Sequence, residues 1–268
     1  MSIAAVIISF NEERNIHDCI ASVHDFCDEV IVLDSGSTDR TREIAEAFPR
    51  VRFSAHPFDG HIEQKNRALA LARTDWVFCL DADERVSPEL ARSIQEFCRE
   101  GTGSVARVKR LTYHMGRPIR HGGWYNARIR LLRPDAGRWG GENPHDEIRP
   151  RERNRGPVLD GDLIHYSFLD LSDQIQTINK FSSIVAFTRQ AHGRPFRTLK
   201  LVFKPVSKFL EMYLFKAGFL DGMPGFIVAA ASAFSTFLKW AKLYELSRGN
   251  IERPSNLRPD YQATLKQK

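Results

Sequence analysis

Trp76-Val77-Phe78-Cys79-Leu80-Asp81-Ala82-Asp83-Glu84 joins an unbroken apolar run to three acids within four positions. Five consecutive apolar residues are typical of a strand that is buried on both faces of a sheet. The acids follow directly, so they are expected at the carboxyl end of that strand. Ser87-Pro88 then opens a helix, because proline is well tolerated in the first helical turn. The segment therefore predicts a strand, an acidic loop and a helix of a layered α/β fold.

The residues before this segment repeat the alternation of strand and helix patterns. Apolar runs predict strands at 3–9, 30–33 and 51–55, and helical patterns lie at 41–48 and 62–72. Asn11 is expected to cap a further helix that runs to about Asp25. Alternating strands and helices imply a mostly parallel sheet that is flanked by helices.

Three polar loops follow strands of this sheet: Asn11-Glu12, Asp34 to Asp39, and Asp81 to Glu84. Ligands of such sheets bind beyond the carboxyl ends of the strands, so the loops are expected to converge on one cleft. Asp34 could accept hydrogen bonds from a base or a ribose. Asp39 is more simply interpreted as a helix cap.

The remainder of the chain divides by composition. Residues 103–166 are β-rich, with glycine pairs and many arginines, and residues from about 170 to 246 carry a helical pattern. We expect an α/β domain at 1–168 and a helical, possibly membrane-associating region at 169–248. Residues 249–268 contain few hydrophobic residues and are predicted to be a flexible tail.

Composition restricts the partners without selecting one. The 268 residues are 42% hydrophobic and 27% charged, which is typical of a folded chain with a substantial core. The net charge of +6 suits a polyanion: nucleic acid, a phosphorylated substrate or anionic lipid. The four cysteines form no CxxC pair and no zinc-finger spacing, so buried thiols are expected. No signal peptide is evident, and a cytoplasmic location fits.

The spacing of Asp81 and Asp83 suits a cation. Two carboxylates separated by one residue can share a hard divalent ion, Mg²⁺ or Mn²⁺, which normally also binds substrate phosphates. Such an ion would neutralise a departing diphosphate. A solvated acidic loop or a helix cap is the alternative. The buried strand and the neighbouring acidic loops favour the metal site.

Four motifs together resemble glycosyltransferase family 2 in residues, order and spacing. They are Ile8-Ser9-Phe10-Asn11-Glu12-Glu13, Val32-Leu33-Asp34-Ser35-Gly36-Ser37-Thr38-Asp39, Gln64-Lys65-Asn66-Arg67-Ala68-Leu69 and Leu80-Asp81-Ala82-Asp83-Glu84. The similarity covers about residues 2–166. It implies a GT-A nucleotide-diphospho-sugar transferase fold with inverting chemistry, followed here by a C-terminal helical appendage. The resemblance also implies that the nucleotide-sugar is bound by Ser9, Asn11, Glu12, Asp34, Ser35, Lys65, Asp81, Ala82, Asp83 and Arg130.

The resemblance extends to metal ligands and a base. Besides Asp81 and Asp83, His145 or His165 could bind the metal, since some relatives use a histidine; a structural role is the alternative for either. Relatives carry an acidic residue in the region of Asn143-Pro144-His145-Asp146-Glu147, often directly after histidine. This points to Asp146 as the base that deprotonates the acceptor hydroxyl. Glu147 is a second candidate, and a polar turn is the alternative interpretation of the motif.

Arginines and tryptophans mark the interval after residue 123. Arg128, Arg130 and Arg133 could grip the donor diphosphate or an anionic acceptor, because guanidinium groups suit phosphate and carboxylate. They could equally lie on the solvated face of a strand. Trp124 and Trp139 could stack on a sugar ring or pack in the core.

The helical region has a basic amphipathic pattern. Lys200, Lys204 and Lys208 recur every four residues beside aromatic and aliphatic positions. No residue between Asp221 and Lys239 is charged, but this stretch falls short of the ~20 apolar residues of a spanning helix. We expect the region to lie on the anionic inner face of the cell membrane. Packing on the α/β domain, or on a second subunit of a homo-oligomer, is the alternative.

Function follows from the resemblance. It implies transfer of a sugar from a nucleotide-diphospho-sugar, foremost a UDP-sugar, to a hydroxyl of a glycan or lipid-linked acceptor. Phe219-Leu220-Asp221-Gly222 and the following helix resemble the tail of bacterial family 2 enzymes related to lipopolysaccharide core glucosyltransferases, which suggests lipopolysaccharide core or cell-envelope glycan synthesis.

Two alternatives belong to other classes. A nucleotidyltransferase usually carries a glycine-rich basic loop where this chain has Ser9-Phe10-Asn11-Glu12. A non-catalytic membrane-surface binding protein is permitted by the basic charge. The sequence contains no recognised nucleic-acid-binding motif, so no nucleic acid partner is expected.

Overall fold

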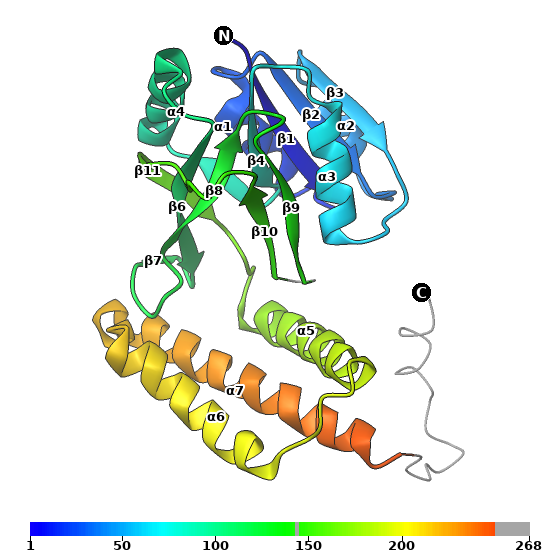
Figure 1. The fold of residues 1–268 in the computed structure, drawn as a ribbon, viewed down its shortest axis with the longest axis vertical. Helices are drawn as coiled ribbons and strands as arrows, with labels where there is room; N and C mark the ends of the chain where they lie inside the picture. The colour runs from blue at the N-terminus through cyan, green and yellow to red at the C-terminus, as the bar shows by residue number, and fades with distance from the viewer. Residues whose placement is uncertain (143–144, 250–268) are drawn as a thin grey trace.

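The computed structural model describes residues 1–142 and 145–249, and at Glu142 and His145 it describes the backbone alone. Strands and helices alternate along the first hundred residues, as the sequence predicts (Figure 1). These elements are β1 (Ile3–Ser9), α1 (Ile16–His24), β2 (Glu29–Asp34), α2 (Thr41–Glu46), β3 (Val51–Ala55), α3 (His61–Leu71), β4 (Trp76–Asp81), β5 (Glu84–Val86) and α4 (Pro88–Glu100).

The rest of the chain adds strands and then helices. They are β6 (Val105–His114), β7 (Arg117–Ile119), β8 (Asn126–Leu132), β9 (Gly137–Glu142), β10 (His145–Pro150), β11 (Val158–His165), α5 (Leu171–Ala191), α6 (Thr198–Leu210) and α7 (Gly222–Ser247). A π-helical turn and a 3₁₀ turn, η1 (Glu211–Phe215) and η2 (Gly218–Asp221), separate α6 from α7. The β-rich and helical intervals lie where they were expected. Residues 250–268 of the predicted tail lie outside the described residues, and the division into domains remains a prediction.

Within the described residues, nine strands form one mixed sheet in the order β3-β2-β1-β4-β8-β6-β11-β5, with β7 paired to β6. The four strands β3, β2, β1 and β4 are parallel, so their carboxyl ends meet at one edge. β8 then pairs antiparallel with both β4 and β6. β9 and β10 form a separate antiparallel hairpin.

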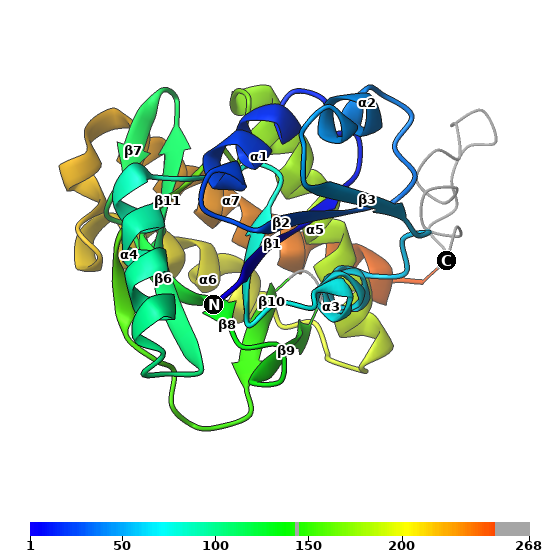
Figure 2. The ribbon, with the colours of Figure 1, turned by 90° about the horizontal axis from the view of Figure 1, so that it is seen from above.

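The apolar run of β1 is buried on both faces of the sheet. Ile3, Ala5 and Ile7 join a core cluster with α1 and α4, whereas Ala4 and Val6 join a second cluster with α3. Side chains alternate along a strand, so a continuous apolar run is what a strand between two helical layers requires. Figure 2 shows α1 and α3 on opposite sides of β1. All four cysteines are free and buried, as expected.

The loop after β1 departs from expectation. Asn11 does not cap a helix: its φ is 56°, and its Oδ1 accepts a hydrogen bond from the backbone N–H of Thr38 at 2.9 Å. α1 begins only at Ile16. Asp39 accepts the N–H of Thr41, the first residue of α2, at 3.0 Å, but the N-cap position itself is Arg40, one residue later than expected. The first and second polar loops are therefore tied to each other.

The three long helices dock on the β7 end of the sheet (Figure 1). The buried carboxylate of Asp221 accepts hydrogen bonds at 2.8 Å from both the backbone N–H and Nδ1 of His121. An apolar cluster joins Ile119 of β7 to Met212 and Val228 of the helical part. Asp221 thus connects two regions that are distant in sequence.

The helical segment that contains the uncharged stretch extends beyond it at both ends. The segment Gly218–Ser247 meets the length and composition of a membrane-spanning helix, which corrects the expectation that it is too short. This is weak evidence, because core helices of soluble proteins meet the same criteria. α7 packs along both α5 and α6.

Candidate active site

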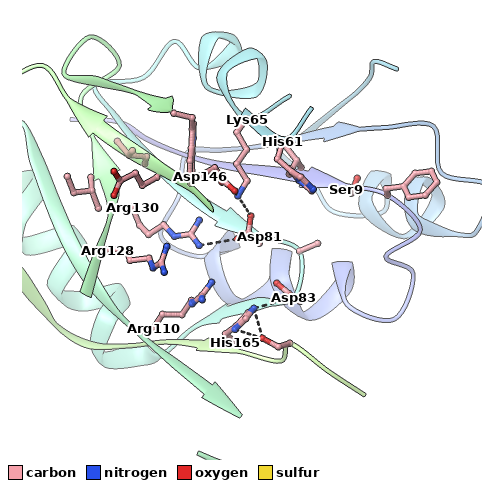
Figure 3. Close-up of a pocket in the computed structure, with 18 of the residues that line it drawn as sticks. Ser9, His61, Lys65, Asp81, Asp83, Arg110, Arg128, Arg130, Asp146 and His165 are labelled. Carbon is pink, nitrogen blue, oxygen red and sulfur yellow. Dashed lines mark hydrogen bonds and ion pairs between the residues drawn. The ribbon is translucent and has the colours of Figure 1, made fainter. Parts of the chain in front are cut away.

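A cavity of about 1010 Å³ opens at the carboxyl ends of β1 and β4 (Figure 3). Its walls also include residues of β6, β8, β9, β10, β11, α3 and α5. This volume is at the upper end of the range for ligand pockets, and it suits a substrate larger than a single sugar. Of the residues expected to bind a nucleotide-sugar, those that line the cavity are Ser9, Glu12, Ser35, Lys65, Asp81, Ala82, Asp83 and Arg130.

Asp81 ends β4 in this cavity, and each of its carboxylate oxygens faces a cation. Oδ1 lies 2.8 Å from Lys65 Nζ, and Oδ2 lies 3.0 Å from a terminal nitrogen of Arg130. Burial opposes the ionisation of Asp81, but the two cations outweigh burial and hold its pKa well below the usual value. Asp81 is therefore a carboxylate at neutral pH.

Glu84 lies below the cavity and contacts both Asp81 and Arg130. Its side chain is fully buried, accepts the backbone N–H of Asp81 at 2.8 Å, and pairs with Arg130 at 2.8 Å. Burial raises the pKa of Glu84, against the opposing effect of Arg130. Arg130 is itself only 4% exposed. Its guanidinium is thus part of a buried frame that holds Asp81 in place.

Lys65 extends the frame from α3 to β10. Its Nζ lies 2.8 Å from Asp146 Oδ2 as well as from Asp81, and 4.4 Å from the centroid of the Trp139 ring. Burial disfavours the ammonium form, but Asp81 and Asp146 more than compensate and raise the pKa of Lys65. Trp139 is 5% exposed and packs in a core cluster. The sequence allowed it either to stack on a sugar ring or to pack in the core, and this packing agrees with the second role.

Asp83 pairs with His165, which ends β11. Their Oδ2 and Nε2 atoms are 3.2 Å apart. Nδ1 of His165 lies 3.2 Å from Thr112 Oγ1, and Ser167 Oγ lies 2.8 Å from Nδ1 and 3.0 Å from Nε2, so two hydroxyls hold the ring. The described residues contain no group of three or more His, Cys, Asp or Glu side chains placed to hold a metal. An ion here would take two protein ligands and depend on the substrate for the others.

Asp34 lies below the cavity rather than in its wall. Its buried carboxylate accepts hydrogen bonds from Ser9 Oγ at 2.8 Å and from the backbone N–H groups of Gly36 and Ser37 at 2.8 and 2.7 Å. It thereby shapes the turn in which Gly36 adopts a φ of 92°. Of the expected nucleotide-sugar residues, Asp34 and Asn11 do not line the cavity.

The two candidate bases differ in setting. The Asp146 side chain is 12% exposed and contacts Lys65, whereas Glu147 is 52% exposed and lies 3.9 Å from Arg149. Both line the cavity. His145 lies at the start of β10, but its side chain, like residues 143–144, is outside the described part of the structure.

Several cavity residues were not expected from the sequence. His61 on α3, Arg110 on β6, and Thr177, Lys180 and Phe181 on α5 line the cavity. Of these, the three α5 residues lie in the helical region, for which the sequence suggested membrane contacts, or packing on the α/β domain or a second subunit, but no part in the cavity. No sequence signal marked them, because α5 reaches the cavity only through tertiary packing.

The motifs of this cavity match a known family. Residues 4–153 match the family model described as glycosyl transferase family 2. The chain belongs to glycosyltransferase family 2. The GT-A fold and the inverting transfer of a sugar from a nucleotide-sugar are thereby confirmed.

Curated relatives cover nearly the whole length of this glycosyltransferase. The lipopolysaccharide core biosynthesis glycosyltransferase LpsC of Rhizobium meliloti (strain 1021) is 33% identical over 252 residues, which are 91% of this chain and 93% of that protein. A glycosyltransferase of Rickettsia typhi is 30% identical over 260 residues, covering 91% and 87%.

The solved structures that match have a lower sequence identity or cover a smaller part of the chain. TarS 1-349 of S. aureus matches with 14% identity and a TM-score of 0.46, covering 94% of this chain and 93% of that chain. Glucosyl-3-phosphoglycerate synthase from Mycobacterium tuberculosis, crystallised with Mn²⁺ and UDP, matches with 30% identity and a TM-score of 0.36, covering 42% and 44%.

Proposed function

We propose that this glycosyltransferase uses a divalent cation bound by Asp83 and His165 to transfer a sugar from a UDP-sugar. The 3.2 Å contact between Oδ2 and Nε2 of these residues carries the proposal. A carboxylate oxygen is a ligand that hard divalent cations prefer, and the imidazole nitrogen beside it would supply a second ligand. The ion would stabilise the charge of the leaving diphosphate. Asp81 is a less suitable ligand, because both its oxygens already face cations.

Asp146 is the proposed base. Figure 3 shows Asp146 and Asp83 on either side of Asp81, and all three residues line the cavity. The carboxylate would accept the proton of the acceptor hydroxyl as that oxygen bonds to the anomeric carbon. The bond from this carbon to the diphosphate breaks, its electron pair leaves with the diphosphate, and the configuration inverts. Lys65 would orient Asp146 through their 2.8 Å contact.

The proposed acceptor is a lipopolysaccharide core or another lipid-linked glycan. The relative LpsC is named for lipopolysaccharide core biosynthesis, and the similarity spans 93% of that protein. Lys180 and Phe181 of α5 line the cavity and would contact an acceptor that enters between the sheet and the helices. Such an acceptor is anchored in a membrane, so the enzyme should work at a membrane surface.

The exposed face of α6 supports this location. α6 has no buried residue, and Leu199, Val202, Phe203 and Val206 are 72%, 54%, 62% and 56% exposed. Their spacing places them on one side of the helix. The lysines lie on other sides of it: Lys200 Nζ lies 5.2 Å from the centroid of the Trp240 ring on α7, and Lys208 pairs with Glu211 at 3.3 Å. An exposed apolar stripe on a helix that also carries lysines suits the anionic inner surface of the cell membrane.

The decisive experiment is a screen of UDP-sugars and other nucleotide-sugars with the full chain, a lipopolysaccharide core acceptor, and Mg²⁺ or Mn²⁺. Release of nucleoside diphosphate and the mass of the acceptor report transfer. We expect one donor to support transfer, and EDTA to abolish it until metal is restored. Full activity in EDTA would overturn the metal proposal, and no transfer or hydrolysis with any UDP-sugar would overturn the donor assignment.

A further inference from the structure

Besides Arg130, which contacts Asp81, two further arginines point into the cavity from neighbouring strands. Arg110 lies on β6 and Arg128 on β8, where the antiparallel register pairs Val108 with Arg128 and Arg110 with Asn126. Residues two apart along such a pair share one face of the sheet. Figure 3 shows Arg128 between Arg130 and Arg110, with all three directed at the cavity.

These two arginines have no carboxylate of their own in the described structure. Arg128 has no ion pair with any side chain that the structure describes, and its Nε donates to Asn126 Oδ1 at 3.1 Å. Arg110 lies 3.8 Å from Glu84, which is already paired with Arg130 at 2.8 Å. Nε of Arg110 is buried and has no hydrogen-bond partner among the described residues. Burial and the proximity of Arg110 and Arg130 lower the pKa of Arg128.

The nearby carboxylates of the cavity already have other partners. Asp81 faces Lys65 and Arg130, Asp146 contacts Lys65, and Asp83 pairs with His165. The buried Nε of Arg110 is therefore left without an acceptor in the part of the chain that the structure describes, and a buried polar group without a partner is costly.

We propose that Arg110 and Arg128 bind an oxyanion, such as a phosphate group, that the acceptor carries. The proposal rests on the proposed function and narrows its acceptor to an anionic glycan. Arg128 lies within electrostatic reach of Asp146 and Glu147, where the acceptor hydroxyl must arrive. Guanidinium groups on adjacent strands offer several donors to the oxygens of one such group.

The donor diphosphate is the other possible source of phosphate for these arginines, and calorimetry separates the two. Inorganic phosphate is titrated into the full chain twice, once without ligands and once after saturation with UDP and Mg²⁺. A separate titration measures the binding of UDP. The variants are Arg110→Gln and Arg128→Gln, and the matched control is Arg117→Gln on β7, an exposed arginine outside the cavity lining. Circular dichroism verifies folding.

We expect phosphate to bind the UDP-saturated protein, and each cavity variant to weaken this binding at least ~10-fold, while UDP affinity and the control stay within about twofold. If UDP displaces phosphate and the variants weaken UDP instead, the arginines belong to the donor site and the proposal is wrong. Phosphate binding that is absent or insensitive to both variants also overturns it. Failure of UDP to bind would refute the proposed function, and phosphate titration of the free protein would still test the two arginines.

Discussion

At the residue scale, Asp83 in the turn after β4 and His165 at the end of β11 are joined by a contact of 3.2 Å. Asp83→Ala removes one of the two proposed metal ligands. We expect transfer to fall more than ~100-fold, beyond the effect of losing an outer-shell partner, with metal-dependent UDP binding lost as well. Asp25→Ala, at a fully exposed side chain, is the control. Near-normal turnover by a folded Asp83→Ala protein would eliminate the metal site.

Asp146 and Glu147 allow a direct comparison of adjacent acids. Asp146→Asn should lower kcat by ~10²–10⁴-fold, the usual contribution of a general base, and leave UDP binding largely unchanged. Glu147→Gln is the matched variant and should remain active, because Glu147 is half exposed and does not contact Lys65. An inactive Glu147→Gln beside an active Asp146→Asn would move the base by one residue. Two active variants would place the base elsewhere.

At the scale of single elements, Ser87 caps the N-terminal end of α4. Its Oγ accepts the backbone N–H of Leu90 at 3.2 Å and that of Asp162 on β11 at 3.1 Å. Ser87→Ala should lower the free energy of unfolding by ~1–2 kcal/mol, since a helix cap is lost. Urea denaturation measures the change. Ser207→Ala, whose hydroxyl only donates to Lys204 O within α6, should change little, and equal effects of both would contradict the capping argument.

The stripe on α6 is tested by flotation with liposomes that contain anionic lipid. We expect the full chain to float at low salt and to be released as salt rises, because lysines near the surface contribute about 1 kcal/mol each and are screened. The double variant Phe203→Ser and Val206→Ser should bind less. Val158→Ser, at an exposed position on β11, serves as the control. If the unmodified chain ignores these liposomes, the stripe more simply packs against a second subunit.

At the scale of the whole molecule, Asp221 links the helices to the sheet by hydrogen bonds. It accepts two hydrogen bonds from His121 across this junction. Asp221→Ala should lower the free energy of unfolding by ~1–3 kcal/mol, because buried donors lose their acceptor. Transfer should suffer more than UDP binding, since α5 lines the cavity through Lys180 and Phe181. Urea denaturation and kinetics measure both; the control is Asp135→Ala, at an exposed residue. Unchanged stability would show that the apolar cluster alone suffices.

Local sequence determined the elements that carry the site. The apolar runs before Ser9, Asp34 and Asp81 predicted buried strands, because period and burial are encoded in neighbouring residues. Parallel strands place their carboxyl ends together, so the three polar loops could be expected at one cavity, which Glu12, Ser35 and Asp81 line. The motifs identified the family. The same reasoning placed Asn11 at a helix start. That prediction was wrong because Asn11 bonds to Thr38, in a different loop.

Tertiary structure decided which of these residues meet. The contacts of Lys65 with Asp146, of Asp83 with His165, and of Arg130 with Glu84 join elements that are far apart in the chain. Their pairing depends on the order of strands in the sheet, on which a local pattern carries no information. The entry of α5 into the cavity wall depends on packing in the same way. Sequence therefore determined the chemical groups and the edge of the sheet where they lie, while the sheet order decided which charges lie within contact distance.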